Sequence, residues 1–226
     1  MSEAPVRRRA RRGEGAALRA ELLRAAMDLL RETGDADAVS VRAVAQRVGV
    51  SVPSLYLHFA DKQALLDAVC EEVFAQLDTA LRDAAREADD PFDALRRQGV
   101  AYVRFAREHP EHYRLVMMTS HAGSEHSVDE LLATGAFAYL VESVQACVDA
   151  GVLVGEPVDL ALSLWASAHG VAALLVAKPY FPWPDVEALV DRTICMSGLG
   201  LAALGRLDPD AGLPPAQLAG ALDRLR

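Results

Sequence analysis

Residues 40–62 combine residue types and spacings that suit the binding of duplex DNA. Ser40 and Ser51 each stand where a helix N-cap is needed, and Gly49 stands where the first helix must end in a left-handed residue. Two short helices joined at Gly49 form a helix-turn-helix, whose second helix enters the major groove in DNA-binding proteins. The predicted DNA-binding residues are Arg42, Ser51, Val52, Pro53, Ser54, Tyr56, Leu57, His58 and Lys62.

These residues divide by the part of the DNA that they are expected to reach. Residues 51–54 and Leu57 are expected near base edges, whereas Tyr56 and His58 can give hydrogen bonds to phosphates. Lys62 begins the next helix, with its charge available to the DNA backbone. The alternative for the whole stretch is an ordinary helical hairpin without a ligand.

The charge distribution supports the DNA-binding interpretation. The chain has 226 residues and a net charge of −9, but residues 1–62 hold 11 Lys/Arg against 8 Asp/Glu, and the remainder holds 12 against 24. Five of the early positive charges are arginines between positions 7 and 12. A basic first segment on an acidic body indicates one end that faces a polyanion, although a solvated basic tail is the alternative for the arginines alone.

A second candidate site lies in the C-terminal half, where Trp165 and His169 share one face of an apolar helix. They are either core residues or walls of a small-molecule cavity in which one polar group orients an apolar ligand. Other aromatic and Met side chains at helical spacing are possible walls of the same cavity. The predicted ligand-binding residues are Tyr102, Phe105, Tyr113, Met117, Tyr139, Trp165 and His169.

The sequence favours no metal, cofactor or catalytic site. His109, His112, His121 and His126 lie near carboxylates and have the chemistry of metal ligands, but two belong to a helix-breaking segment and two to a predicted loop. The three cysteines are far apart and lack a CxxC spacing, which indicates reduced thiols. HExxH, GxSxG, Walker and Rossmann patterns are all absent, so we expect no enzyme.

Apolar residues recur at helical spacing along the chain, and alternating strands are missing, so the predicted class is all-α. We expect a flexible basic arm at 1–15, a DNA-binding domain at 16–62, a connecting helix at 63–90 and a helical ligand-binding and dimerisation domain at 91–226. The helix predicted from Ser127 to Asp149 begins at a capping box, and a short helix is predicted at 216–225. The uncharged segment 160–177 is interpreted as a fully buried core helix rather than a membrane span.

The N-terminal residues resemble the TetR family of bacterial transcriptional regulators. Residues 41–45, 49–51, 55–59 and 62–66 follow that family's N-terminal pattern, with Pro53 standing where many members have Gly or Ala. The resemblance implies a dimer that binds a pseudo-palindromic operator through two such heads. It also implies a C-terminal helical domain in which a small ligand releases the DNA.

The C-terminal half is similar to a TetR subgroup named for a "WHG" regulatory domain. The segment 109–115 resembles its "HPxxYRL" segment, and residues 165–170 match the spacing of the Trp, His and Gly. We therefore predict a cytoplasmic, homodimeric, ligand-responsive repressor that binds an operator and a small, largely apolar inducer. Its dimer interface is expected on helices 157–177 and 184–204, where small residues such as Gly198 and Ala202 allow close approach.

Several alternatives remain open from the sequence alone. Within DNA binding, the chain is alternatively an activator or a regulator that senses a protein. A helical enzyme with a DNA-targeting head and a structural nucleoid protein are alternatives from other classes, the last distinguished by a low specificity ratio for DNA sequence.

Overall fold

The computed structural model describes residues 14–118, 135–206 and 220, and in these residues every regular element is an α-helix. This confirms the predicted all-α class. The helices are α1 Glu14–Thr33, α2 Val41–Val48, α3 Val52–Tyr56, α4 Lys62–Ala85, α5 Pro91–Glu108, α6 Pro110–Met118, α8 Gly135–Asp149, α9 Pro157–Ala177 and α10 Val186–Leu204. The arm at 1–13, the start of the helix predicted at Ser127 and nearly all of residues 216–225 lie outside the described residues.

The chain forms two compact units whose boundaries differ from the predicted domains. One unit, here called the head unit, contains residues 1–77 and 108–124, and the other, the body unit, contains residues 78–107 and 125–226. Helix α4 therefore begins in the head unit and ends in the body unit, and α6 belongs to the head unit. Residues 14 and 15, predicted within the flexible arm, already form the first turn of α1.

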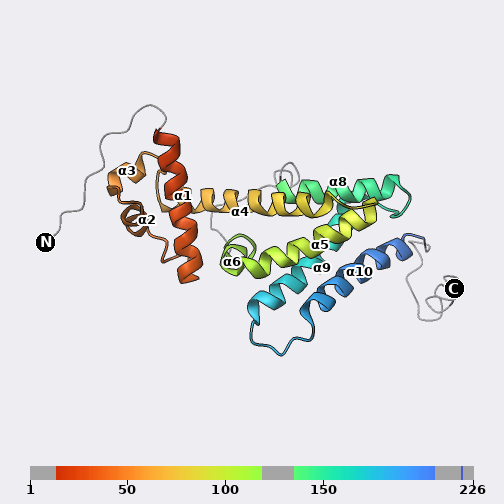
Figure 1. Cartoon of the computed structure of the whole chain (residues 1–226). Helices are drawn as coiled ribbons and strands as arrows, with labels where there is room; N and C mark the ends of the chain where they lie inside the picture. Colours follow the sequence, from red (N-terminus) through yellow and green to blue (C-terminus); the bar gives the residue numbers. More distant parts are fainter. Residues whose placement is uncertain (1–13, 119–134, 207–219, 221–226) are drawn as a thin grey trace. The chain divides into compact units, whose positions relative to one another are not determined.

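In the head unit, α2 packs on α1, and α3 packs on α2 (Figure 1). Leu22 of α1, Val44 of α2 and Leu55 of α3 are completely buried, as their helical spacing predicts. Leu30 continues this buried face of α1, whereas Leu29 is half-buried. Arg47 donates two hydrogen bonds to Glu32, at 2.8 and 2.6 Å, and so links α2 to α1 at the surface.

Helix α6 packs on α1 within the head unit through a buried histidine. His112 is buried, and its Nε2 lies 3.4 Å from the carbonyl oxygen of Met27, while its ring stacks on His109. Burial lowers the pKa of His112 below its usual value, and the contact with Met27 opposes this only partly. Burial between α6 and α1 therefore favours the neutral imidazole.

The body unit is built on α9, which packs between α8 and α10. A cluster of buried side chains joins α5, α8, α9 and the segment between the last two; its members are Leu95, Val144, Cys147, Leu153, Leu160 and Ala161. Helices α5 and α10 approach so closely that a Cβ on Gly99 would lie 2.8 Å from Ile194. A side chain larger than hydrogen therefore cannot be accommodated at position 99 unless Ile194 moves.

Helix α9 is not fully buried, so the prediction of a fully buried core helix was wrong. It is long and apolar enough to cross a membrane by length and composition, but it is a helix of the body unit that contacts two other helices. One of its faces is open, with Leu162, Gly170 and Leu174 exposed. The sequence could not distinguish this arrangement from full burial, because apolar residues surround the helix on every side.

Candidate functional site

The helix-turn-helix in the head unit is set by two side-chain caps and one glycine. Ser40 Oγ accepts a hydrogen bond from the backbone N–H of Ala43, which is the predicted cap of α2. Gly49 has φ 76°, and its N–H reaches the carbonyl oxygens of Ala45 and Gln46 to end that helix. A side chain at Gly49 would be strained in this left-handed conformation, so the turn requires glycine or a residue that tolerates positive φ.

Helix α3 starts at the second cap. Ser51 Oγ accepts a hydrogen bond from the backbone N–H of Ser54 and lies 2.8 Å from Ser54 Oγ. Pro53 stands in the first turn, where its missing N–H costs no intrahelical hydrogen bond. Leu55 is buried and fixes the helix to the head unit, so the remaining side chains of α3 are directed elsewhere.

The predicted DNA-binding residues lie at the surface. Tyr56 is 50% exposed and Leu57 is 84% exposed, which is unusual for large apolar side chains without a partner. None of the nine predicted residues is buried, and Arg42 is exposed and forms no ion pair with any described residue. The surface thus combines hydroxyl, imidazole, guanidinium and apolar groups, which are the types that contact phosphates, bases and thymine methyl groups.

The charge of Lys62 was predicted to be available to the DNA backbone, but it is paired within the head unit. Its Nζ lies 3.3 Å from Asp37 Oδ1 and 3.4 Å from the carbonyl oxygen of Asp37, so the charge is not free. Asp37 lies 25 residues earlier in the chain, in the segment between α1 and α2, and spacing along the sequence gave no sign of the pair. Because both groups are exposed, the pair is weak enough to be exchanged for a phosphate.

In the body unit, three predicted ligand-binding residues form one hydrogen-bonded cluster. The indole Nε1 of Trp165 donates to the hydroxyl of Tyr102 at 3.3 Å, and that hydroxyl lies 3.2 Å from Nδ1 of His169. Phe137 packs edge-on against Trp165 with ring centroids 5.8 Å apart. We call these four residues the aromatic cluster; it joins α5, α8 and α9.

The aromatic cluster is only partly closed. Tyr102 is 7% exposed, but Phe137, Trp165 and His169 are half-buried and keep surface open beside the buried hydroxyl. Burial lowers the pKa of His169 and so favours its neutral ring. A flat apolar molecule is the kind of ligand that such walls would contact.

The other predicted ligand-binding residues do not all join this cluster. Phe105 is buried in the body unit, and the Tyr139 ring lies 4.1 Å from the guanidinium carbon of Arg82 in a cation–π contact. Tyr113 and Met117 are on α6 and therefore belong to the head unit. Tyr113 is 1% exposed, which is typical of a core residue of that unit.

Two polar residues of the body interior were missed by the sequence analysis. Gln98 is buried on α5, and its Nε2 donates to Ser143 Oγ on α8 at 2.8 Å. The available signal was their position on the apolar faces of two predicted helices, where a polar residue needs a hydrogen-bond partner.

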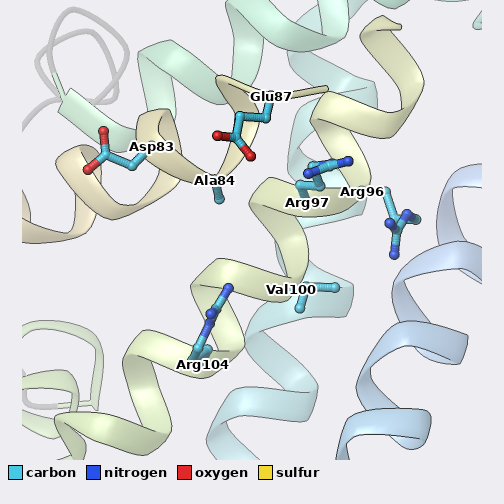
Figure 2. Close-up of a pocket in the computed structure, with 7 residues that line it drawn as sticks. All are labelled: Asp83, Ala84, Glu87, Arg96, Arg97, Val100 and Arg104. Atoms are coloured by element: carbon cyan, nitrogen blue, oxygen red, sulfur yellow. The ribbon is translucent and has the colours of Figure 1, made fainter. Parts of the chain in front are cut away.

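A surface cleft of about 410 Å³ lies elsewhere in the body unit, between the end of α4 and the outer face of α5 (Figure 2). Its lining shares no residue with the predicted ligand set and is mostly charged: Asp83, Ala84, Glu87, Arg96, Arg97, Val100 and Arg104. Arg97 is engaged by Asp93, and Arg96 by Asp93 and by Asp191 of α10. Most of the positive charge is thus neutralised within the chain, and the cleft lacks the apolar walls predicted for the ligand.

The described residues contain no group of three side chains arranged to hold a metal ion. His112 is engaged with Met27 and His109, while His121 and His126 lie outside the described residues. Cys70, Cys147 and Cys195 are free thiols, and burial raises the pKa of Cys70 and of Cys147 to about 11. Those two thiols are therefore protonated and unreactive at neutral pH.

A capped helix-turn-helix with an exposed second helix, attached to a helical body, defines a DNA-binding transcription regulator. Two family models match the chain: residues 22–69 match "Bacterial regulatory proteins, tetR family" and residues 95–196 match "Tetracyclin repressor-like, C-terminal domain". The chain belongs to the TetR family, as the sequence motifs predict. The finer resemblance to the WHG subgroup stays a prediction.

Individual relatives agree with this assignment. The chain is 49% identical over 55 residues to the tetracycline repressor protein class A of Escherichia coli, but that match covers 24% of this chain and 25% of the repressor. It is 28% identical over 178 residues to the transcriptional regulator RutR of Escherichia coli K12, which covers 76% of this chain and 78% of RutR. A solved structure of a protein of unknown function from Rhodococcus sp. RHA1 has 31% identity and a TM-score of 0.72, covering 88% of this chain and all of that one.

Proposed function

We propose that this protein is a cytoplasmic homodimeric repressor, which binds a pseudo-palindromic operator and is released from it by a small, largely apolar molecule. The observation that carries the ligand response is the aromatic cluster, where a buried tyrosine hydroxyl adjoins half-exposed apolar rings. A core that served only packing would bury Trp165 and Phe137 as completely as it buries Leu153.

The proposed operator contacts are the nine residues predicted from the sequence. The exposed side chains of α3 support this role, because Leu55 alone anchors that helix and leaves Tyr56 and Leu57 facing solvent. Selection on random duplexes by gel shift tests the role, with enrichment of one two-fold symmetric sequence as the expected result. Recovery of unrelated sequences with equal affinity would reject the repressor and favour a structural nucleoid protein.

The arginines between positions 7 and 12 are proposed to add affinity by contacting phosphates or a minor groove. This rests on their charge density in the sequence. Deletion of residues 1–12 is expected to lower operator affinity and the salt slope without changing the selected sequence. Unchanged affinity at low salt would reject the role.

The proposed dimer interface is the open face shared by α9 and α10. Leu162 and Leu174 on α9 and Met196 and Leu199 on α10 are exposed, a set of large apolar side chains that a second copy can cover. The two small residues singled out in the sequence serve a different purpose. Gly198 is buried with its Cα hydrogens facing Phe92 of the same chain, and Ala202 packs against the body core.

A charge on the open face tests the dimer. Leu199→Glu is expected to give a folded monomer whose operator affinity falls by at least about tenfold, because two half-sites are no longer bound together. Ala146→Glu, at an exposed position of α8 outside the proposed interface, is the matched control. Sedimentation of the wild-type chain as a monomer at micromolar concentration would reject this interface.

Release by ligand is tested by screening small molecules for loss of the operator complex. A ligand that binds the DNA-free state tenfold better shifts operator affinity by about 1.4 kcal/mol. Trp165→Phe is expected to blunt the response to any molecule found, with little change in operator affinity. A reporter placed behind the selected operator then distinguishes a repressor from an activator.

A further inference from the structure

One buried polar atom in the body unit has no hydrogen-bond partner among the described residues. Gln98 lies on α5 with 2% of its surface exposed; its Nε2 donates to Ser143 Oγ, but its Oε1 accepts nothing. Both ends of a buried side-chain amide are ordinarily hydrogen-bonded. An end without a partner loses the hydrogen bond that it made to water in the unfolded chain. The atom that lacks a partner is an acceptor, so it needs a donor.

The orientation of the Gln98 amide follows from its neighbour. Ser143 has one hydroxyl hydrogen, and it is used in a 2.9 Å hydrogen bond to the carbonyl oxygen of Tyr139, one turn earlier on α8. Ser143 Oγ therefore has only lone pairs to offer, and it can face only the NH2 end of the amide. A flipped Gln98 would place two acceptors against each other, so the carbonyl oxygen is the end without a partner.

Gln98 stands next to the aromatic cluster on the same face of α5. Tyr102 follows it by one helical turn, a spacing at which two side chains are neighbours. The hydroxyl of Tyr102 accepts from Trp165 and is bonded to His169, so three helices supply polar atoms to this part of the interior. One helical turn from the acceptor, the cluster therefore offers half-buried aromatic rings and uncharged polar groups.

We propose that Gln98 Oε1 is the recognition atom for the ligand, which is a neutral, flat, largely apolar molecule carrying one N–H or O–H donor. This rests on the proposed function, since it names the ligand class of the same body unit. An ionised carboxylate has no hydrogen to give to an amide carbonyl, and an isolated charge would lose its water without gaining a counterion from the uncharged groups of the cluster. A donor on a flat apolar body satisfies Oε1 and contacts the rings of Phe137 and Trp165.

The test uses pairs of probes that differ only in the donor. Indole and benzofuran have nearly the same shape, and only indole has an N–H; 2-naphthol and 2-fluoronaphthalene form a second pair with an O–H. Binding of each probe to the full-length wild-type chain is measured by isothermal titration calorimetry at pH 7. We expect the donor member of at least one pair to bind about tenfold more tightly than its partner, because the unmatched carbonyl discriminates between them.

Gln98→Met removes the acceptor while keeping the length of the side chain. In this variant the two members of a pair are expected to bind equally, and Gln98→Leu provides a second test if the first variant does not fold. Gln145→Met is the matched control, because Gln145 is an exposed glutamine of α8 that bonds to Asp149 and should leave the preference intact.

Each other outcome overturns part of the proposal. Equal binding within both pairs by the wild-type chain removes the donor requirement and leaves the ligand site itself standing. A preference that survives Gln98→Met assigns recognition to another atom. If no probe binds at millimolar concentration, the proposed ligand class is wrong, whereas the repressor function is judged separately by operator release in the wider screen.

Discussion

The surface of α3 and the interior around Tyr102 carry the two proposed activities in opposite ways. On α3, the side chains that matter are exposed, and their backbone is fixed by caps within a few residues of the chain. Around Tyr102, the important polar atoms are partly buried, and their residues lie 63 and 67 positions after Tyr102 in the chain. Substitutions on the surface of α3 are therefore expected to change function without changing stability. Substitutions around Tyr102 are expected to change both.

The largest effect is expected in the interior, for Tyr102→Ala. Loss of the buried ring should lower the free energy of unfolding by about 3–5 kcal/mol. Tyr102→Phe keeps the ring and loses only the hydroxyl, so it should cost about 1 kcal/mol. Urea unfolding followed by circular dichroism measures both, and equal costs for the two variants would mean that the hydrogen bonds outweigh the packing.

The next largest effect is expected at the turn of the head unit, for Gly49→Val. A β-branched residue at φ 76° is strained, which should cost about 1–3 kcal/mol and weaken operator binding. Gly49→Asn should cost less, because asparagine tolerates the left-handed region. Gly15→Ala is the control, since an added Cβ there would make only an ordinary 3.9 Å contact with His58. Thermal unfolding of the three variants decides whether the backbone angle at position 49 is the cause.

A substitution at the exposed Tyr56 is expected to change DNA binding and leave stability nearly unchanged. Tyr56→Phe is expected to leave the free energy of unfolding within about 0.5 kcal/mol of wild type. Loss of a phosphate hydrogen bond should nevertheless weaken binding to all duplexes by about tenfold. Gel shifts on the selected operator and on an unrelated duplex measure this, and a change confined to the operator would instead place Tyr56 at a base edge.

The smallest expected effect is the dependence of folding stability on pH, and one histidine in each unit contributes to it in the same direction. Burial lowers the pKa of His112 and of His169 in the folded chain, so the unfolded chain binds more protons as the pH falls through the ordinary histidine range. Folding stability should therefore decrease from pH 7 towards pH 5. The unfolding free energy of His112→Phe and of His169→Phe should depend less on pH than that of wild type, and an unchanged dependence in both would exclude these two rings as the cause.

The head unit was predictable in detail because its determinants are close together in sequence. Ser40, Gly49 and Ser51 act on backbone groups within five residues of themselves, and the structure confirms each of these caps. The pair between Lys62 and Asp37 was not predictable, because two exposed groups 25 residues apart leave no pattern in the sequence. The DNA contacts themselves stay a prediction.

The body unit was less predictable because its helices are apolar on several faces. Periodicity located α5, α9 and α10 but not the neighbour of each face, so α9 was expected to be fully buried and Gly198 was assigned to the dimer interface. Tyr113 and Met117 were grouped with the body because α6 follows α5 directly, whereas α6 packs with α1.

The sequence by itself determined the helices, the caps of the helix-turn-helix and the family, because each of these depends on residues a few positions apart. Only the tertiary structure decided which polar atoms meet in the interior: Trp165 and His169 at the hydroxyl of Tyr102, and Ser143 at one end of Gln98. The physical reason is that a buried hydrogen bond is selected by the packing of several helices at once. No single helix carries that information in its own pattern of residues.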